Sequence, residues 1–383
     1  MKIDYNQDIL ERFIPIAFHE LKESVYTFET ASIEQIDSFA SLIESYYHQI
    51  FHSRLIDIKR SYNPFNPDSD TLTNKVHTKE QLETLQADFL ANITPLLNDA
   101  NYEEITEQDL NEAMSETSPY GVEVNVDFED FEIIKLFFRG SALKQEQLRD
   151  PKTLYLKKKE HTTHIYRRLF ILFKQKNAEE KEQGQIYLKL FKDIPRNDLE
   201  MLFPNTKVKI SLIDKLKLAV TGGGGTIGGA ATLLSKLATA LDPIALLTAI
   251  GAFAAILWRQ ISSIFNHRVK YMAQLAKSLY YYNLDNNAGV ISHMVDIAEA
   301  EEAKEAFLAY IFLLNNPNGL TKVALDTQIE NFIEEKFFVK TDFEIDDAID
   351  KLNDLGVISK EQEIYKALDI ESSIKRLQEQ MTF

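Results

Sequence analysis

The glycine-rich run GGGGTIGG, residues 222–229, is the first place where the sequence suggests phosphate chemistry. A Walker phosphate loop needs GxxxxGK followed by Ser or Thr, because the lysine neutralises the phosphates and the hydroxyl binds magnesium. No lysine directly follows the last two glycines, which argues against a nucleotide site. Small residues four apart instead let helices pack closely, and the glycines with this spacing are Gly224, Gly225, Gly228 and Gly229. A flexible segment leading into the apolar region is the alternative.

Metal chemistry is suggested by one histidine-containing helix face. Glu44, His48 and His52 recur every four residues, a spacing that can bind zinc. The pattern lacks the HExxH glutamate that would act as a base, and aromatic neighbours crowd the same turn, so we expect a partly buried structural face. His161 and His164 are three residues apart near an expected hairpin and should point to opposite strand faces. With no Ser-His-Asp or lysine-based catalytic set in the sequence, we expect a protein without enzymatic activity, cofactor or metal.

Two other polar groups have simple structural explanations. Asp285, Asn286, Asn287 and Gly289 suit a turn, since Asn, Asp and Gly tolerate left-handed backbone geometry. A functional polar loop is the alternative there. Acidic pairs such as Glu301–Glu302 and Asp346–Asp347 are common in this chain of net charge −17, so we expect them to lie on solvated faces.

The charge is unevenly distributed along the chain. Residues 1–130 carry a net charge of −18, residues 131–217 carry +9 and residues 218–383 carry −8. Basic side chains next to a membrane attract anionic lipid headgroups, although ordinary solvated strand charge is an equal alternative. The predicted membrane-surface residues are Lys157, Lys158, Lys159, Arg167, Arg168, Lys215, Lys217, Trp258 and Arg259.

The basic block precedes an apolar segment that has the composition of a membrane hairpin. Residues 219–258 contain only two charged side chains, Lys236 and Asp242. The second arm, Pro243–Trp258, reaches about 24 Å as a helix, short of a ~30 Å hydrocarbon core unless Arg259 snorkels. A buried helical hairpin in a soluble protein is the alternative. Basic residues flank both ends of the segment, which predicts a two-pass topology with both termini in the cytoplasm.

The segments on either side differ in hydrophobic period. Residues 1–117 have helical spacing, with Ser32 as an N-cap, Pro64 and Pro67 ending the helix, and a second helix over Lys79–Leu97. From Val122 the alternation predicts about five strands of a mainly antiparallel sheet. Within this region we expect KKKEHTTH, residues 157–164, to include a hairpin connection and FKDIPRNDLEMLFP, residues 191–204, to return to helix.

The C-terminal third is expected to be helical to about Asn315, and then to follow the order of a winged-helix module. Its supposed recognition helix, DFEIDDAIDKLNDLG, is acidic, whereas phosphate contacts need Lys and Arg. Nucleic acid is therefore excluded as a partner, and protein docking or structural packing is favoured.

Taken together these stretches resemble the family called domain of unknown function 3754, which includes transmembrane protein 143. The matching stretches, spread over residues 55–370, are YNPFNPDSDT, ANYEEITEQDL, VDFEDF with the later FFRG, FKDIPRNDLEMLFP, LDNNAG, AEEAKEAFLAYIFLL and DFEIDDAIDKLNDLGVI. The resemblance implies two membrane segments after the FKDIP region and implies no established activity. Ala288 departs from the arginine expected in the family at that position.

The sequence thus predicts an α+β multidomain protein. The expected parts are a helical N-terminal region (1–120), a basic, mainly antiparallel β domain (121–217), an apolar, transmembrane hairpin (218–265), a helical segment (266–317) and a winged-helix-like module (318–383). We expect a membrane-anchored, non-enzymatic scaffold or regulatory protein whose partners are the lipid bilayer, its anionic headgroups and a protein not identified by the sequence. A self-assembling homo-oligomer that forms a pore through the glycine-rich hairpin is the alternative.

Overall fold

A computed structural model describes residues 2–4, 10–70, 76–106, 108–110, 123–125, 128–149, 158–176, 184–196, 199, 202–203, 207–209 and 280–381. The chain divides into two compact units. The first comprises Met1–Ser115, Phe128–Leu199 and Asn283–Phe383, and the second comprises Glu116–Asp127 and Glu200–Tyr282. The apolar segment 218–265 and its four packing glycines lie outside the described residues.

The first unit begins with helices whose limits follow local sequence signals. Helix α1 spans Phe18–Ser24, α2 spans Ile33–Tyr62 and α3 spans Lys79–Asp99. The Ser32 hydroxyl and the Gln35 side chain form a reciprocal capping box at the start of α2, which confirms the predicted N-cap. The helix ends at Tyr62, where the 3-10 turn η1, Asn63–Phe65, contains the predicted helix-ending proline.

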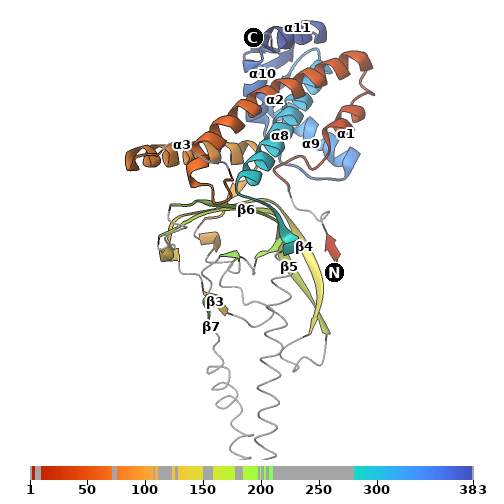
Figure 1. Cartoon of the computed structure of the whole chain (residues 1–383). Helices are drawn as coiled ribbons and strands as arrows, with labels where there is room; N and C mark the ends of the chain where they lie inside the picture. The colour runs from red at the N-terminus through yellow and green to blue at the C-terminus, as the bar shows by residue number, and fades with distance from the viewer. Residues whose placement is uncertain are drawn as a thin grey trace, which may run out of the picture. The chain divides into compact units, whose positions relative to one another are not determined.

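An antiparallel sheet lies against this helical layer (Figure 1). Its strands are β1 Lys2–Asp4, β4 Phe131–Arg149, β5 Lys158–Gln175, β6 Tyr187–Pro195 and β8 Asn283–Asn286, in the order β1-β4-β5-β6-β8. The short β2, Glu103–Glu104, also pairs with β4, which the 3-10 turn η2, Phe128–Asp130, precedes. Side chains from one face of the sheet, including Phe137 and Phe170, share a hydrophobic core with the helices.

One local prediction in this region is wrong, and a second is wrong for its first residues. The run KKKEHTTH contains no hairpin connection between residues 158 and 164, because these residues belong to β5 and pair with β4 from Leu143 to Arg149. The run FKDIPRNDLEMLFP does not return to helix at its first residues, because FKDIP is the end of β6 and pairs with β5 from Phe191 onward. The return to helix was expected near Asp198, and the described residues Arg196, Leu199 and Leu202 do have 3-10 geometry. In both places the pairing partner lies on another strand, so the local pattern did not reveal it.

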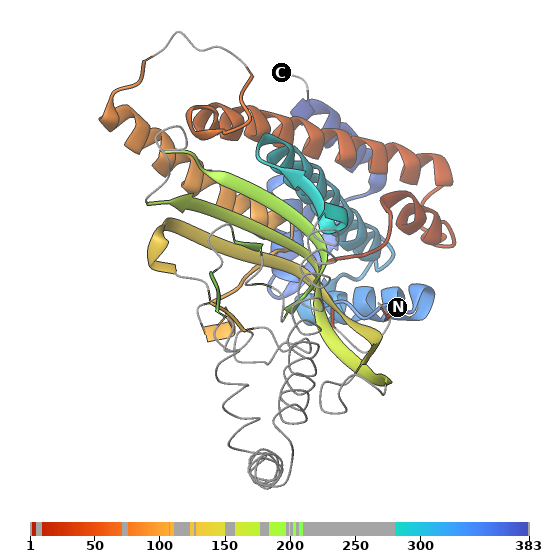
Figure 2. The same ribbon diagram turned by 60° about the horizontal axis from the view of Figure 1, so that its bottom comes forward.

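Helix α8, Ala288–Leu314, lies at the centre of the first unit. It contacts α1, α2, α3 and the C-terminal helices, and Figure 1 shows it between α2 and the later helices. Figure 2 shows the long β4–β5 ribbon continuing past the helices. From Glu301 to Leu313 every residue of α8 is buried, which is the pattern of a helix covered on all sides.

The C-terminal part consists of helices and a small sheet. Strand β9, Leu320–Thr321, precedes helices α9, Lys322–Phe337, and α10, Ile345–Asp354. Strands β10, Ile358–Glu361, and β11, Ile364–Ala367, then lead to α11, Ile370–Met381, and the strand order is β10-β11-β9. In the second unit, β3, Glu123–Asn125, pairs with β7, Lys207–Lys209.

The α+β class with N-terminal helices and an antiparallel sheet is confirmed. Among the described helices, none is both long enough and apolar enough to cross a membrane.

Candidate functional site

The most unusual chemistry of the described residues is a group of charged side chains buried in the middle of α8. Glu301, Glu302, Lys304 and Glu305 each expose between 1% and 8% of their surface. The prediction that Glu301–Glu302 is a solvated acidic face is therefore wrong. Buried charges are costly unless they are paired, so the partners of these residues define how α8 is held.

Glu301 is held by the sheet and by the N-terminal segment. Its Oε1 forms an ion pair with Arg139 Nη2 of β4 at 2.8 Å and accepts a hydrogen bond from Lys304 Nζ at 2.7 Å. Its Oε2 accepts from the backbone N–H of Ile14 at 2.9 Å, and Lys304 Nζ donates to the Ile14 carbonyl at 2.9 Å. These contacts hold the N-terminal segment around Ile14 against α8.

The same N-terminal stretch is also joined to the sheet and to the C-terminal part. Arg167 of β5 donates to Glu11 at 2.7 Å, and the Phe13 ring lies 4.0 Å from the Arg139 guanidinium carbon. Burial raises the pKa of Glu11 even though Arg167 opposes this shift. The backbone of Glu11 donates to the Lys340 carbonyl at 3.1 Å and accepts from Asp342 at 2.9 Å.

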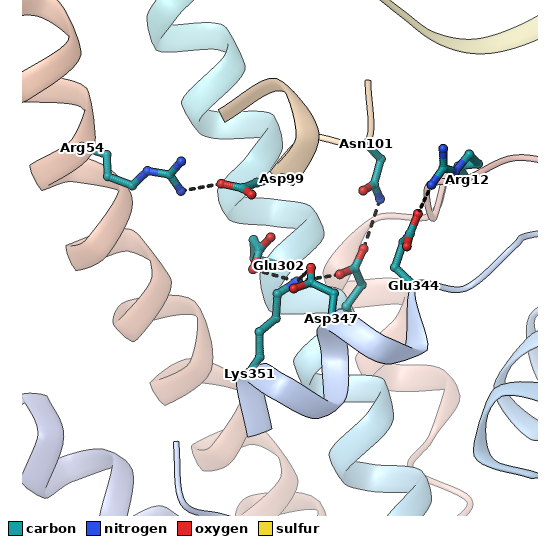
Figure 3. Close-up of polar contacts among 9 residues, drawn as sticks. Arg12, Arg54, Asp99, Asn101, Glu302, Glu344, Asp347 and Lys351 are labelled. Carbon is teal, nitrogen blue, oxygen red and sulfur yellow. Dashed lines mark hydrogen bonds and ion pairs between the residues drawn. The ribbon is translucent and has the colours of Figure 1, made fainter. Parts of the chain in front are cut away.

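A second cluster faces α10 (Figure 3). The ammonium of Lys351 lies 2.7 Å from a carboxylate oxygen of each of Glu302, Glu305 and Asp347. Asn101 adds a hydrogen bond to Glu305 of 3.1 Å. These contacts join α10 and the end of α3 to the central helix.

This cluster carries more acid than base. Burial raises the pKa of Glu302 to about 8, although Lys351 opposes the shift. Burial also raises the pKa of Glu305. For Lys351 burial acts in the opposite direction, but attraction to Glu305, Glu302 and Asp347 outweighs it and raises the pKa. Because a single lysine faces three carboxyl groups, the cluster retains a proton near neutral pH.

Among the described residues, these three carboxyl groups have the spacing that a cation site needs. One oxygen of each lies within 4.8 Å of the others. The Lys351 ammonium forms an ion pair with all three, so a bound metal ion would have to displace this ammonium. The arrangement therefore stabilises helix docking.

The predicted polar loop lies at the start of α8, where Asn287 has a positive φ of 50° with ψ −122°. Asn287 is buried, and its Oδ1 accepts from the Leu188 N–H at 3.1 Å and from the Tyr62 hydroxyl at 3.3 Å. Its Nδ2 donates to Asp68. The side chain thus ties β6, α2 and the loop after η1 to the first turn of α8.

The neighbouring polar residues support the same turn. Asp285 lies 2.8 Å from His293 Nδ1, and a Cβ atom on Gly289 would come within 2.8 Å of the Asp285 carboxylate. Asn286 pairs with Lys189 in the sheet. The structure therefore brings the four predicted loop residues together at the junction of β8 and α8.

The other predicted residues are dispersed or undescribed. Arg167 is paired with Glu11, and Arg168 Nη1 donates to the Arg167 carbonyl at 2.8 Å. His48 lies 3.1 Å from Glu299, and its ring centre lies 6.0 Å from that of His52. Lys158 and Lys159 lie in β5. The residues outside the described ranges are Lys157, Lys215, Lys217, Gly224, Gly225, Gly228, Gly229, Trp258 and Arg259.

Sequence reasoning missed the charged residues that the structure brings together. The roles of Arg139, Lys304 and Lys351 depend on contacts between distant segments. A usable signal was present in α8, because the run AFLAYIFLL is apolar around the whole helix and so predicts burial of the preceding EEAKE.

Residues 166–289 match the family model described as protein of unknown function, DUF3754. The chain carries a DUF3754 domain. This domain runs from within β5 to the start of α8, so it includes the Asn287 junction and both strands that flank the apolar segment. The predicted family resemblance is thereby confirmed, and no solved structure matches the chain.

Proposed function

We propose that the protein is a membrane-anchored, non-enzymatic scaffold or regulatory protein. Its first compact unit would lie on one side of the bilayer, and the apolar segment 219–258 would be the anchor. The C-terminal part, with a winged-helix-like order of elements, would dock a protein partner.

The pairing of β6 with β8 carries the anchoring proposal. Leu190 pairs with Asp285 and Phe191 with Asn283, so the two strands are antiparallel neighbours. The chain leaves this sheet at the end of β6 and returns to it at β8, with the nearly uncharged segment in between. A folded domain stays on one side of a bilayer, so a segment that leaves and rejoins one sheet crosses an even number of times. A two-helix hairpin satisfies this condition.

Exposed apolar side chains support the docking role of the C-terminal part. Val323 near the start of α9 is 75% exposed, and Phe338 at its C-cap is 81% exposed. Several exposed carboxylates, including Asp346 and Asp350, lie on α10. The acidity of α10 favours a protein over a nucleic acid as the partner of this part.

Membrane attachment is tested by fractionation. The protein should remain in the membrane pellet after alkaline carbonate and leave it in detergent. Complete release by carbonate alone would refute the anchor.

The orientation is tested by labelling, because the chain contains no cysteine. Single cysteines at exposed Leu10 and Lys375 and at Thr239 are treated with a membrane-impermeant maleimide in intact cells. The positive-inside rule predicts labelling at position 239 alone, with the other two positions labelled only after permeabilisation. Labelling at positions 10 and 375 with none at 239 would reverse the orientation. Labelling of only one of positions 10 and 375 in intact cells would refute an even number of crossings.

A further inference from the structure

A row of basic side chains crosses the sheet on the face that packs against the helices. The register places Arg139 of β4 opposite Arg168 of β5, and Arg168 opposite Lys192 of β6. Directly opposite residues point to the same face of a sheet. The preceding row on this face, Phe137, Phe170 and Leu190, belongs to the hydrophobic core shared with the helices.

Only one member of this row has an acidic partner among the described residues. Glu301 pairs with Arg139. Arg168 donates only to a backbone carbonyl, and neither Arg168 nor Lys192 has an acidic partner among the described residues. Like charges directly opposite each other destabilise a sheet. The row therefore carries positive charge without a counter-charge, and a bound anion would neutralise it.

Tyr102 extends the row on its other side. Since Glu103 pairs with Phe138 in an antiparallel register, Tyr102 takes the position beside Arg139. Its side chain is only 3% exposed, and its hydroxyl has no hydrogen-bond partner in the part of the chain that the structure describes. The buried Nε of Arg139 likewise has no partner among these residues. Burial raises the pKa of Tyr102 to about 12, and Arg139 and Arg168 oppose that shift, which shows that the phenol lies within the field of both guanidinium groups.

We propose that Tyr102, Arg139, Arg168 and Lys192 form a binding site for a small phosphate-like anion. The hydroxyl, the guanidinium N–H groups and the ammonium are all donors, and charge-assisted hydrogen bonds to phosphate oxygens are the strong type. Arg168 and Lys192 are partly exposed, which leaves one side of the site open to solvent.

The test uses the full-length protein in a neutral detergent with inorganic phosphate as the probe. Binding is measured by calorimetry and by thermal shift, with chloride at matched ionic strength as the reference. Tyr102→Phe removes the hydroxyl, and Lys192→Met removes the ammonium while keeping most of the stem. Lys189→Met is the matched control, because Lys189 is on the same strand and partly exposed but faces the other side of the sheet.

We expect saturable phosphate binding by the wild type and by Lys189→Met. Tyr102→Phe and Lys192→Met should each bind at least about tenfold more weakly, a loss of ~1.4 kcal/mol. In chloride alone Tyr102→Phe should be as stable as the wild type or more stable, because it removes a buried hydroxyl without a partner. This result would separate loss of a ligand contact from loss of folding.

Two results would overturn the site: absence of saturable binding to the wild type, or equal affinity in all four proteins. A further arm identifies the source of the phosphate group. Mixed micelles of phosphatidic acid in the same detergent that displace inorganic phosphate, where phosphatidylcholine micelles do not, would assign the site to a lipid headgroup. Persistence of phosphate binding in the presence of both kinds of micelle would assign it to a soluble anion.

Discussion

Replacement of Glu302 by glutamine tests whether the Lys351 cluster holds a proton. The folded protein raises the pKa of Glu302 from 4.5 to about 8, so between these values the folded state binds a proton that the unfolded state has released. Its contribution to stability is fully present below pH 4.5 and is lost as the pH rises towards 8. Glutamine has the shape of the protonated acid and cannot lose this proton.

The size of the expected stability difference follows from the binding of a single proton. A difference of one bound proton changes the free energy of unfolding by about 1.4 kcal/mol per pH unit. Between about pH 6 and pH 7.5 the wild type should therefore lose ~2 kcal/mol relative to Glu302→Gln. For a unit of this size the difference corresponds to roughly 4–8 °C in Tm.

The assay is thermal unfolding of both proteins followed by circular dichroism from about pH 4 to 8.5, so that the range begins below the pKa of 4.5 that Glu302 has in the unfolded chain. The two proteins should have similar stability at the acidic end, and the variant should be the more stable at the alkaline end. Glu334→Gln is the control, since Glu334 is half exposed and 3.9 Å from Lys340, and its profile should run parallel to that of the wild type. If Glu302 is instead an ordinary ionised partner of Lys351, its loss should destabilise the protein at every pH by about 3–5 kcal/mol. A constant deficit of this kind would refute the shared proton.

Three other substitutions test contacts of the same unit by thermal unfolding. Lys351→Met should destabilise by about 3–5 kcal/mol, because it leaves buried carboxylates without their cation, and a cost below about 1 kcal/mol would contradict this. Asn287→Ala should lower the free energy of unfolding by about 1 kcal/mol more than Asn287→Gly does, because both variants lose the side-chain hydrogen bonds but only glycine suits φ 50°. Equal losses of stability would show that the backbone is unstrained. Gly140→Ala should destabilise the protein more than Gly184→Ala, although both glycines have positive φ. A Cβ on Gly140 would come within 2.8 Å of Phe13, whereas a Cβ on Gly184 would have no atom within 4 Å. Equal costs would show that the Phe13 contact relaxes freely.

Local sequence signals determined the limits of the N-terminal helices. Ser32 caps α2 as predicted, and α3 covers the predicted Lys79–Leu97 and continues to Asp99. Thr106 and Asp109 also pair locally, since the Asp109 N–H donates to the Thr106 hydroxyl at 3.2 Å. These features form between residues a few positions apart, so the sequence contains all the information they need.

The sequence also determined the change from helix to antiparallel strands, but the ends of the strands depended on their partners. The polar run from Lys158 to His164 has little strand character of its own, yet it pairs with β4 along its whole length. Likewise Asp193 and Pro195 lie in β6 because the neighbouring β5 continues beside them. Strand ends follow tertiary pairing because an extended segment is stabilised by the strand next to it.

The burial of charge on α8 was decided only by the tertiary structure. In the sequence, Glu301 and Glu302 resemble the many solvated acids of an acidic chain. Their cations come from Arg139 on the sheet and Lys351 on α10, separated from them by long stretches of sequence, and from Lys304 one turn along the helix. Periodicity identifies which face of a helix is apolar, but it does not count the charges that other segments bring to that face. The sequence therefore determined α8 as a helix, and the folded chain determined which of its charges are buried, because burial requires partners that only folding brings close.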